Sequence, residues 1–270
     1  MAEAYTAFPL TGRINLLVRL GHGSVTVTAR DDIDEATVRL TPRDRRSELL
    51  ERTAVEMRGP TLAVMAPRQG GIADALVGWR RDRDRIDAEI VVPSGTATKI
   101  TTASADIIVK GRIGGADLVT GSATIEVDTV DGDLRLRYGS ATSSVQRVTG
   151  SATVRSGAGN ASFGEVVGVL QAGFGSGDLA VDVAYGGVRS RAGSGDAHIG
   201  VVHGDVDLAA GSGGVSIGLP AGISARLEVT TGSGRVQSEL PIEQTTANTG
   251  KSITIKARTG SGDVRLFRAA

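Results

Sequence analysis

Glycine recurs along the middle of this chain at an interval of 18 residues, and this interval constrains the fold more than any other feature. One series runs through Gly121, Gly139, Gly157, Gly175, Gly193 and Gly211. A second series, offset within the same unit, runs through Gly114, Gly132, Gly150, Gly168, Gly186 and Gly204. A constant interval of this kind indicates that one supersecondary unit is stacked several times.

Apolar residues between the glycines keep the same interval. One column consists of Val109, Val127, Val145, Phe163, Val181, Ile199 and Ile217. A second column is read as Leu118, Leu136, Val154, Leu170, Ser190 and Leu208, with Leu170 shifted from the strict position, which Ala172 occupies. Along each segment apolar residues alternate with others, as at Leu179, Val181 and Val183, which is the period of a β-strand. Each unit therefore reads as strand, glycine turn, strand, glycine turn.

The predicted fold is all-β: a parallel β-solenoid, that is, a flattened two-sheet β-helix with 18-residue coils. One such unit cannot bury its apolar face alone, so equivalent strands should stack about 4.8 Å apart into two facing parallel sheets. Val181 should then lie directly between Phe163 and Ile199. An antiparallel sandwich of hairpins is the alternative, but it gives no reason for a constant interval.

The extent of the repeat predicts three segments. Residues 1–95 lack the period and are expected to form a β-rich N-terminal cap; the stretches that resemble strands are Ile14–Leu20, Ser24–Ala29, Thr37–Leu40, Thr61–Ala66 and Ile86–Val92. Within this cap, residues 47–58 carry apolar residues near helical spacing after the candidate cap Ser47, which predicts one short helix. Residues 67–85 read as a loop. Residues 96–218 form the regular β-solenoid, and residues 219–270 form irregular C-terminal coils of the same solenoid.

Composition narrows the classes of function. The chain has 270 residues with 30 basic and 30 acidic side chains, so no net charge favours nucleic acid or an anionic membrane. The absence of cysteine excludes disulfides and thiolate metal sites. No apolar run is long enough for a transmembrane segment, and the first 20 residues lack the features of a signal peptide. A cytoplasmic protein is therefore expected.

The glycine turns do not match catalytic or phosphate-binding motifs. Windows such as GSGDLA and GSGDAH lack the third glycine and the following helix of a dinucleotide site, and no glycine stands two residues before the serine as in a nucleophile elbow. The three histidines, His22, His198 and His203, have no helical metal-ligand spacing. GSGD resembles calcium-binding repeats, but its aspartate follows glycine directly and too few oxygens are available per turn. No catalytic residue, metal or cofactor is predicted.

The outward columns carry the strongest indication of function. One predicted sheet presents Asp106, Glu126, Asp128, Asp178, Asp182 and Asp196. The opposite sheet presents the candidate binding residues Arg135, Arg137, Arg155, Arg189 and Arg191. Oppositely charged faces could steer a partner or self-association, whereas an ordinary solvated surface is the alternative. Trp79, beside Arg80 and Arg81, is a further candidate interface anchor, or it packs on its own cap.

Three stretches resemble a known family. These are VPSGTATKITTASADIIVKGRIGGADLVTGSATIEV, the recurring GSGD turns and the terminal RTGSGDVRLFR, with GHGSVTVTARD and MAPRQGG similar to actinobacterial members. The chain resembles the bacterial "putative adhesin" family of β-strand-repeat domains of unknown function, also described as toastrack-type domains. The resemblance implies a stacked β-repeat fold, a link to envelope stress or surface functions in some members, and no catalytic residues.

The predicted function is that of a non-enzymatic interaction or scaffold protein that presents an extended β-solenoid surface. Its partner would be an unknown protein or a second copy, and nucleic acid is not predicted. A polysaccharide-binding or polysaccharide-cleaving β-helix protein is one alternative, although the chain has only one tryptophan and three tyrosines for stacking on sugars. A self-assembling filament subunit is the other.

Overall fold

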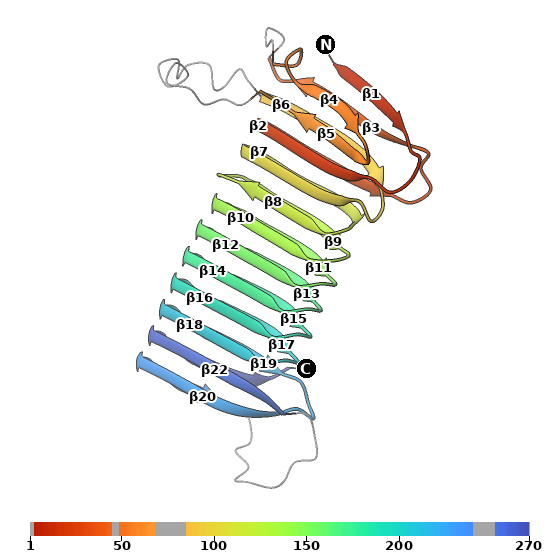
Figure 1. Ribbon diagram of the computed structural model, residues 1–270. Helices are drawn as coiled ribbons and strands as arrows, with labels where there is room; N and C mark the ends of the chain where they lie inside the picture. Colours follow the sequence, from red (N-terminus) through yellow and green to blue (C-terminus); the bar gives the residue numbers. More distant parts are fainter. Residues whose placement is uncertain (1–2, 45–48, 68–84, 240–251, 270) are drawn as a thin grey trace, which may run out of the picture. The chain divides into compact units, whose positions relative to one another are not determined.

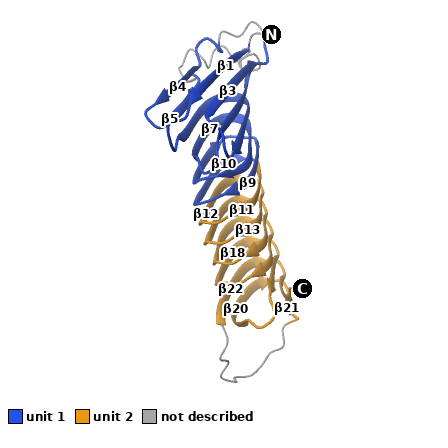
Figure 2. Ribbon diagram, turned by 90° about the vertical axis from the view of Figure 1, so that its right-hand side faces the viewer, with its two compact units in different colours: residues 1–141 blue, residues 142–270 orange. Residues whose placement is uncertain are grey.

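The computed structural model describes residues 3–44, 49–67, 85–239 and 252–269. These residues form 23 strands, and none of them forms a helix, so no described helix could cross a membrane. The chain separates into two compact units, residues 1–141 and residues 142–270 (Figure 2). The division into segments 1–95, 96–218 and 219–270 stays a prediction.

Ten strands form the first unit. They are β1 (Ala4–Pro9), β2 (Asn15–Arg30), β3 (Glu35–Pro42), β4 (Ala54–Arg58), β5 (Thr61–Met65), β6 (Arg85–Pro93), β7 (Ala97–Ile113), β8 (Ala116–Thr120), β9 (Thr124–Val130) and β10 (Leu134–Ser140). The long strands β2 and β7 pair in parallel along both halves and so belong to two ladders, β4–β5–β2–β7–β8–β10 and β1–β3–β6–β2–β7–β9. Antiparallel pairing is confined to β1–β3, β3–β6 and β4–β5.

Thirteen strands form the second unit. They are β11 (Thr142–Val148), β12 (Ala152–Ala158), β13 (Ala161–Val166), β14 (Leu170–Ser176), β15 (Leu179–Ala184), β16 (Val188–Ser194), β17 (Ala197–Val202), β18 (Val206–Ser212), β19 (Val215–Leu219), β20 (Ser224–Ser233), β21 (Val236–Ser238), β22 (Ser252–Ser261) and β23 (Val264–Arg268). The even ladder, as we name it, is β12–β14–β16–β18–β22–β20 (Figure 1). The odd ladder is β11–β13–β15–β17–β19–β23–β21. All of these pairs are parallel, as predicted.

The register follows the sequence interval. Val181 pairs with Phe163 on one side and with Ile199 on the other, each 18 residues away. All three side chains are at most 2% exposed, so the column is part of the core. The predicted stacking of coils is confirmed in this unit.

One assignment in the second apolar column is wrong. Ala172, not Leu170, pairs with Val154 and Ser190. Leu170 belongs to the neighbouring column, where it pairs with Ala152 and Val188. The larger side chain suggested the shift, but the backbone hydrogen bonds hold the strict interval regardless of side-chain volume.

The predicted short helix at residues 47–58 is also wrong where it is described. Residues 54–58 form β4, which pairs antiparallel with β5 across a two-residue turn at Gly59 and Pro60. Gly59 has a φ of 55°, which suits glycine in such a turn. Val55 and Met57 fit a period of two as well as a helical period, and pairing with β5 selects the strand. Ser47 lies outside the described residues.

The last coil in the sequence is not the last coil in space. β22 lies between β18 and β20, and β23 lies between β19 and β21 (Figure 1). Val206 therefore pairs with Ile255, which is 49 residues away, and Ile255 pairs in turn with Leu227. This insertion accounts for the loss of the 18-residue interval after residue 219.

Candidate binding face

Six cationic side chains project outward from the even ladder of the second unit. We call this surface the basic face; its cations are Arg155, Arg189, Arg191, Arg226, Lys256 and Arg258. Two carboxylates, Asp207 and Glu228, lie among them. Alternation along each strand turns these residues away from the core columns. The described face thus carries an excess of four positive charges although the whole chain is neutral.

The cations of the basic face recur at every second coil. Arg155, Arg191 and Arg258 occupy one column, with Gly173 and Ala209 in the coils between them. In the adjacent column, Arg189 and Lys256 flank Asp207. Two strand spacings separate neighbouring cations of a column by about 10 Å.

Some of these cations are already paired. Arg191 donates hydrogen bonds from both of its terminal nitrogens to the carboxylate of Asp207, the shorter at 2.8 Å. This hydrogen bond lowers the pKa of Asp207 below its usual value and raises the pKa of Arg191. Lys256 Nζ lies 3.3 Å from a carboxylate oxygen of Glu228. Arg155 and Arg189 are exposed and make no ion pair within the described residues.

Two of the predicted arginines belong to the first unit. Arg137 donates a 2.9 Å hydrogen bond to Asp117, and Lys99 Nζ lies 3.5 Å from the same carboxylate. Burial raises the pKa of Asp117, but Arg137 and Lys99 outweigh it and hold this pKa below its usual value. Arg135 is exposed on β10. The candidate residues are therefore divided between the units as Arg135 and Arg137 in the first and Arg155, Arg189 and Arg191 in the second, whereas Trp79 lies outside the described residues.

The aspartates of the GSGD turns have a structural role. Asp178 and Asp196 lie in turns and not on the outer face of a strand, which corrects their predicted place. Each accepts a hydrogen bond through Oδ1 from a backbone amide of the next coil, at 2.8 Å from Asp196 and at 2.7 Å from Gly214. Asp106 accepts in the same way from Thr124 at 2.9 Å. The 18-residue interval between donor and acceptor was the sequence signal for this role.

Metal and acid–base chemistry find few groups in the described part of the chain. No set of three His, Asp or Glu side chains there is placed to hold a metal ion. His198 stacks on Phe267 with ring centroids 6.2 Å apart, and His203 stacks on Tyr185 at 5.0 Å. Both histidines thus make aromatic contacts on the surface of the second unit.

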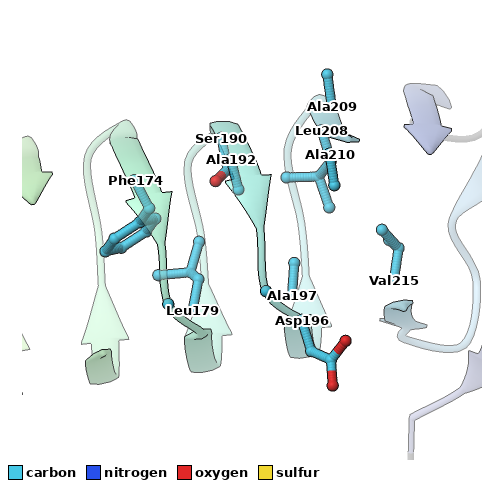
Figure 3. A pocket seen from close by; sticks show the side chains of 12 residues that line it. Phe174, Leu179, Ser190, Ala192, Asp196, Ala197, Leu208, Ala209, Ala210 and Val215 are labelled. Atoms are coloured by element: carbon cyan, nitrogen blue, oxygen red, sulfur yellow. The ribbon is translucent and has the colours of Figure 1, made fainter. Parts of the chain in front are cut away.

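The second unit contains one small hollow among its core columns (Figure 3). Phe174, Ser190, Ala192, Leu208 and Ala210 line it, together with residues of the facing ladder. It arises where the alanines follow Phe174 in the same column. Its volume of about 10 Å³ is at the lower limit for one water molecule. A substrate or cofactor does not fit there.

These features define a class: a parallel β-solenoid with a flat charged face and, within the described residues, no ligand-sized cavity. No family model and no curated protein matches the sequence. The chain is similar to the solved structure named "putative adhesin" from Parabacteroides merdae, with 12% identity, a TM-score of 0.46 and coverage of 98% of this chain and 95% of that one.

Two other structures are similar over comparable lengths. The "putative cell adhesion protein" from Clostridium sporogenes has 11% identity, a TM-score of 0.30 and coverage of 99% and 100%. The "putative lipid binding protein" from Parabacteroides distasonis has 10% identity, a TM-score of 0.37 and coverage of 98% and 96%. The adhesin names agree with the family resemblance of the sequence, but identities and TM-scores at this level transfer no function.

Proposed function

We propose that this chain is a non-catalytic binding or scaffold protein that holds an acidic partner on the basic face. The observation that supports this proposal most directly is the recurrence of Arg155, Arg191 and Arg258 in one exposed column of a rigid sheet. A stacked β-repeat presents extended surfaces, and this one has an excess of one charge where binding is open to solvent.

The chemistry of the face fits a ligand with repeated carboxylates. A guanidinium donates charge-assisted hydrogen bonds to a carboxylate, and its planar geometry favours two bonds at once. Cations about 10 Å apart suit an extended polymer whose carboxylates recur at a similar distance. Acidic polysaccharides and acidic protein segments share this chemistry.

Binding should be measured with two defined probes, polygalacturonate and poly-glutamate, and with dextran as an uncharged control. We expect the two anionic probes, or one of them, to bind and dextran not to bind. Affinity should fall as salt is added, because exposed ion pairs are screened. Binding of one anionic probe alone would identify the source of the carboxylates, and binding of neither would contradict the proposal.

The variant R155S/R189S/R258S removes three cations of the basic face. We expect it to lose about tenfold or more in affinity at low salt, since each lost ion pair contributes on the order of 0.5 kcal/mol. The matched control R147S/R265S/R268S removes the same net charge from β11 and β23. Equal losses in both variants would show that net charge, and not this face, governs binding. Release of reducing ends from polygalacturonate would instead support the polysaccharide-cleaving alternative.

A further inference from the structure

The even ladder of the second unit ends at β20, whose outer edge has no neighbouring strand among the described residues. Leu227 on β20 points toward the core but is 38% exposed, whereas its partner Ile255 is fully buried. The facing ladder ends in the same way, because Val236 is 50% exposed and its partner Val264 is fully buried. The terminal coil thus leaves aliphatic core residues open on one side.

The backbone of β20 is also open at Leu227. In its column, each earlier member donates its amide to the following coil: Ala152 to the carbonyl of Val169, Leu170 to that of Gly187 and Val188 to that of Asp205. Leu227 is the last member of this column. By the same geometry its N–H and C=O point to the free edge, where an added strand can hydrogen-bond to them.

The sequence of β20 is self-complementary about Leu227. When the strand Ser224–Ser233 is paired antiparallel with itself and centred on Leu227, Arg226 lies opposite Glu228 of the second strand, and Glu228 lies opposite Arg226. Ala225 then lies opposite Val229, and both positions face the core side. Ser224 lies opposite Thr230. Opposite charges and apolar pairs directly across an antiparallel ladder are stabilising.

We propose that β20 pairs with β20 of a second copy of this chain, antiparallel and centred on Leu227, in a two-fold symmetric dimer. The same patch serves on both copies, as two-fold symmetry requires. The two Leu227 side chains would cover each other, and main-chain hydrogen bonds would extend the even ladder across the contact. This inference does not depend on the proposed ligand of the basic face.

The dimer changes what the basic face can do. A two-fold axis normal to the sheet reverses the strand direction but keeps the even ladder on the same side. The basic faces of the two copies therefore become parts of one sheet, and a long polymer bound to one is held near the other. Such bivalence increases the apparent affinity without any new contact.

Sedimentation velocity over a range of protein concentrations tests the dimer. We expect the wild-type chain to dimerise reversibly and L227K to remain monomeric, because a lysine on an edge strand opposes pairing. R226E and E228R should each remain monomeric alone, since like charges then face each other. An equimolar mixture of R226E and E228R should dimerise again, because every charged pair across the contact is restored.

Two measurements keep the proposal falsifiable if a variant is destabilised. Circular dichroism and the urea midpoint establish that each variant is folded, and R155E on β12 is the control for a charge reversal far from the edge. In the wild-type dimer the amide of Leu227 should be protected from hydrogen exchange. A wild-type monomer at all concentrations, an unchanged dimer in R226E, or protection of Leu227 in a monomer would each overturn the proposal.

Discussion

The backbone N–H of Asp196 donates a 2.8 Å hydrogen bond to Oδ1 of Asp178, which stands one coil earlier. The same contact joins Asp178 to Oδ1 of Asn160 at 2.8 Å and Gly214 to Oδ1 of Asp196 at 2.7 Å. The side chain of one turn thus supplies the acceptor for the backbone of the next. This ladder explains why an aspartate follows the glycines of the repeat without any need for a calcium ion.

We expect Asp178→Ala to destabilise the chain by about 1 kcal/mol, because the amide of Asp196 loses its acceptor. Asp178→Asn should remain near the wild type, since Asn160 already performs the same task with an amide oxygen. The urea midpoint of unfolding measures both variants. Equal loss in Asp178→Asn would show that the negative charge, and not the hydrogen bond, is what matters.

We expect Gly177→Ala to be strongly destabilising, by about 2 kcal/mol or more. Gly177 has a φ of 135°, and an added Cβ would overlap the carbonyl of Gly159 in the preceding coil. The control is Gly173→Ala on the neighbouring strand, where an added Cβ meets no atom within 4 Å and the backbone is extended. Thermal unfolding of the two variants should differ by several degrees; similar melting temperatures would contradict the assigned turn geometry.

Stability at low pH should depend on Asp87. Arg43 and Ser24 donate hydrogen bonds to its carboxylate at 2.8 Å and 2.7 Å. Burial raises the pKa of Asp87, but these hydrogen bonds and the charge of Arg43 outweigh it, so the pKa is lower than usual. A lowered folded-state pKa stabilises the fold above the unfolded value of about 3.9, and this contribution is lost as the pH falls through the folded value.

In Arg43→Gln the pKa of Asp87 should rise, so that the loss of stability begins at a higher pH than in the wild type. Urea midpoints measured from pH 2 to pH 6 follow this change, and the titration of Asp87 by NMR gives its direction. Arg39→Gln on β3 is the control, since it removes the same charge without contacting Asp87. An unchanged pH profile in Arg43→Gln would refute this account.

Much of the second unit could be predicted from spacing alone. The column through Phe163, Val181 and Ile199 follows from an 18-residue interval, because parallel coils of equal length place equivalent residues side by side. The error at Leu170 shows the limit of this reasoning: side-chain size was allowed to override the interval, whereas the backbone ladder was not affected by it. The segment containing Val55 and Met57 was ambiguous for a different reason, since short apolar patterns fit either period.

The candidate face was only partly predictable. Alternation identified Arg155, Arg189 and Arg191 as outward residues, but Arg191 proved to be paired with Asp207 from the next strand. Lys256 and Arg258 were missed because the insertion of β22 brings them beside residues about 50 positions earlier. No local pattern reports such a pairing.

The sequence by itself determined the repeat: strand length, the place of each glycine turn and which side chains face the core, since these depend on contacts one coil apart. Only the tertiary structure decided how the array ends and which charges meet there. Strand order at an end depends on which edges find partners over long separations, and β22 lies beside β18 because it completes a ladder that the next segment along the chain leaves open.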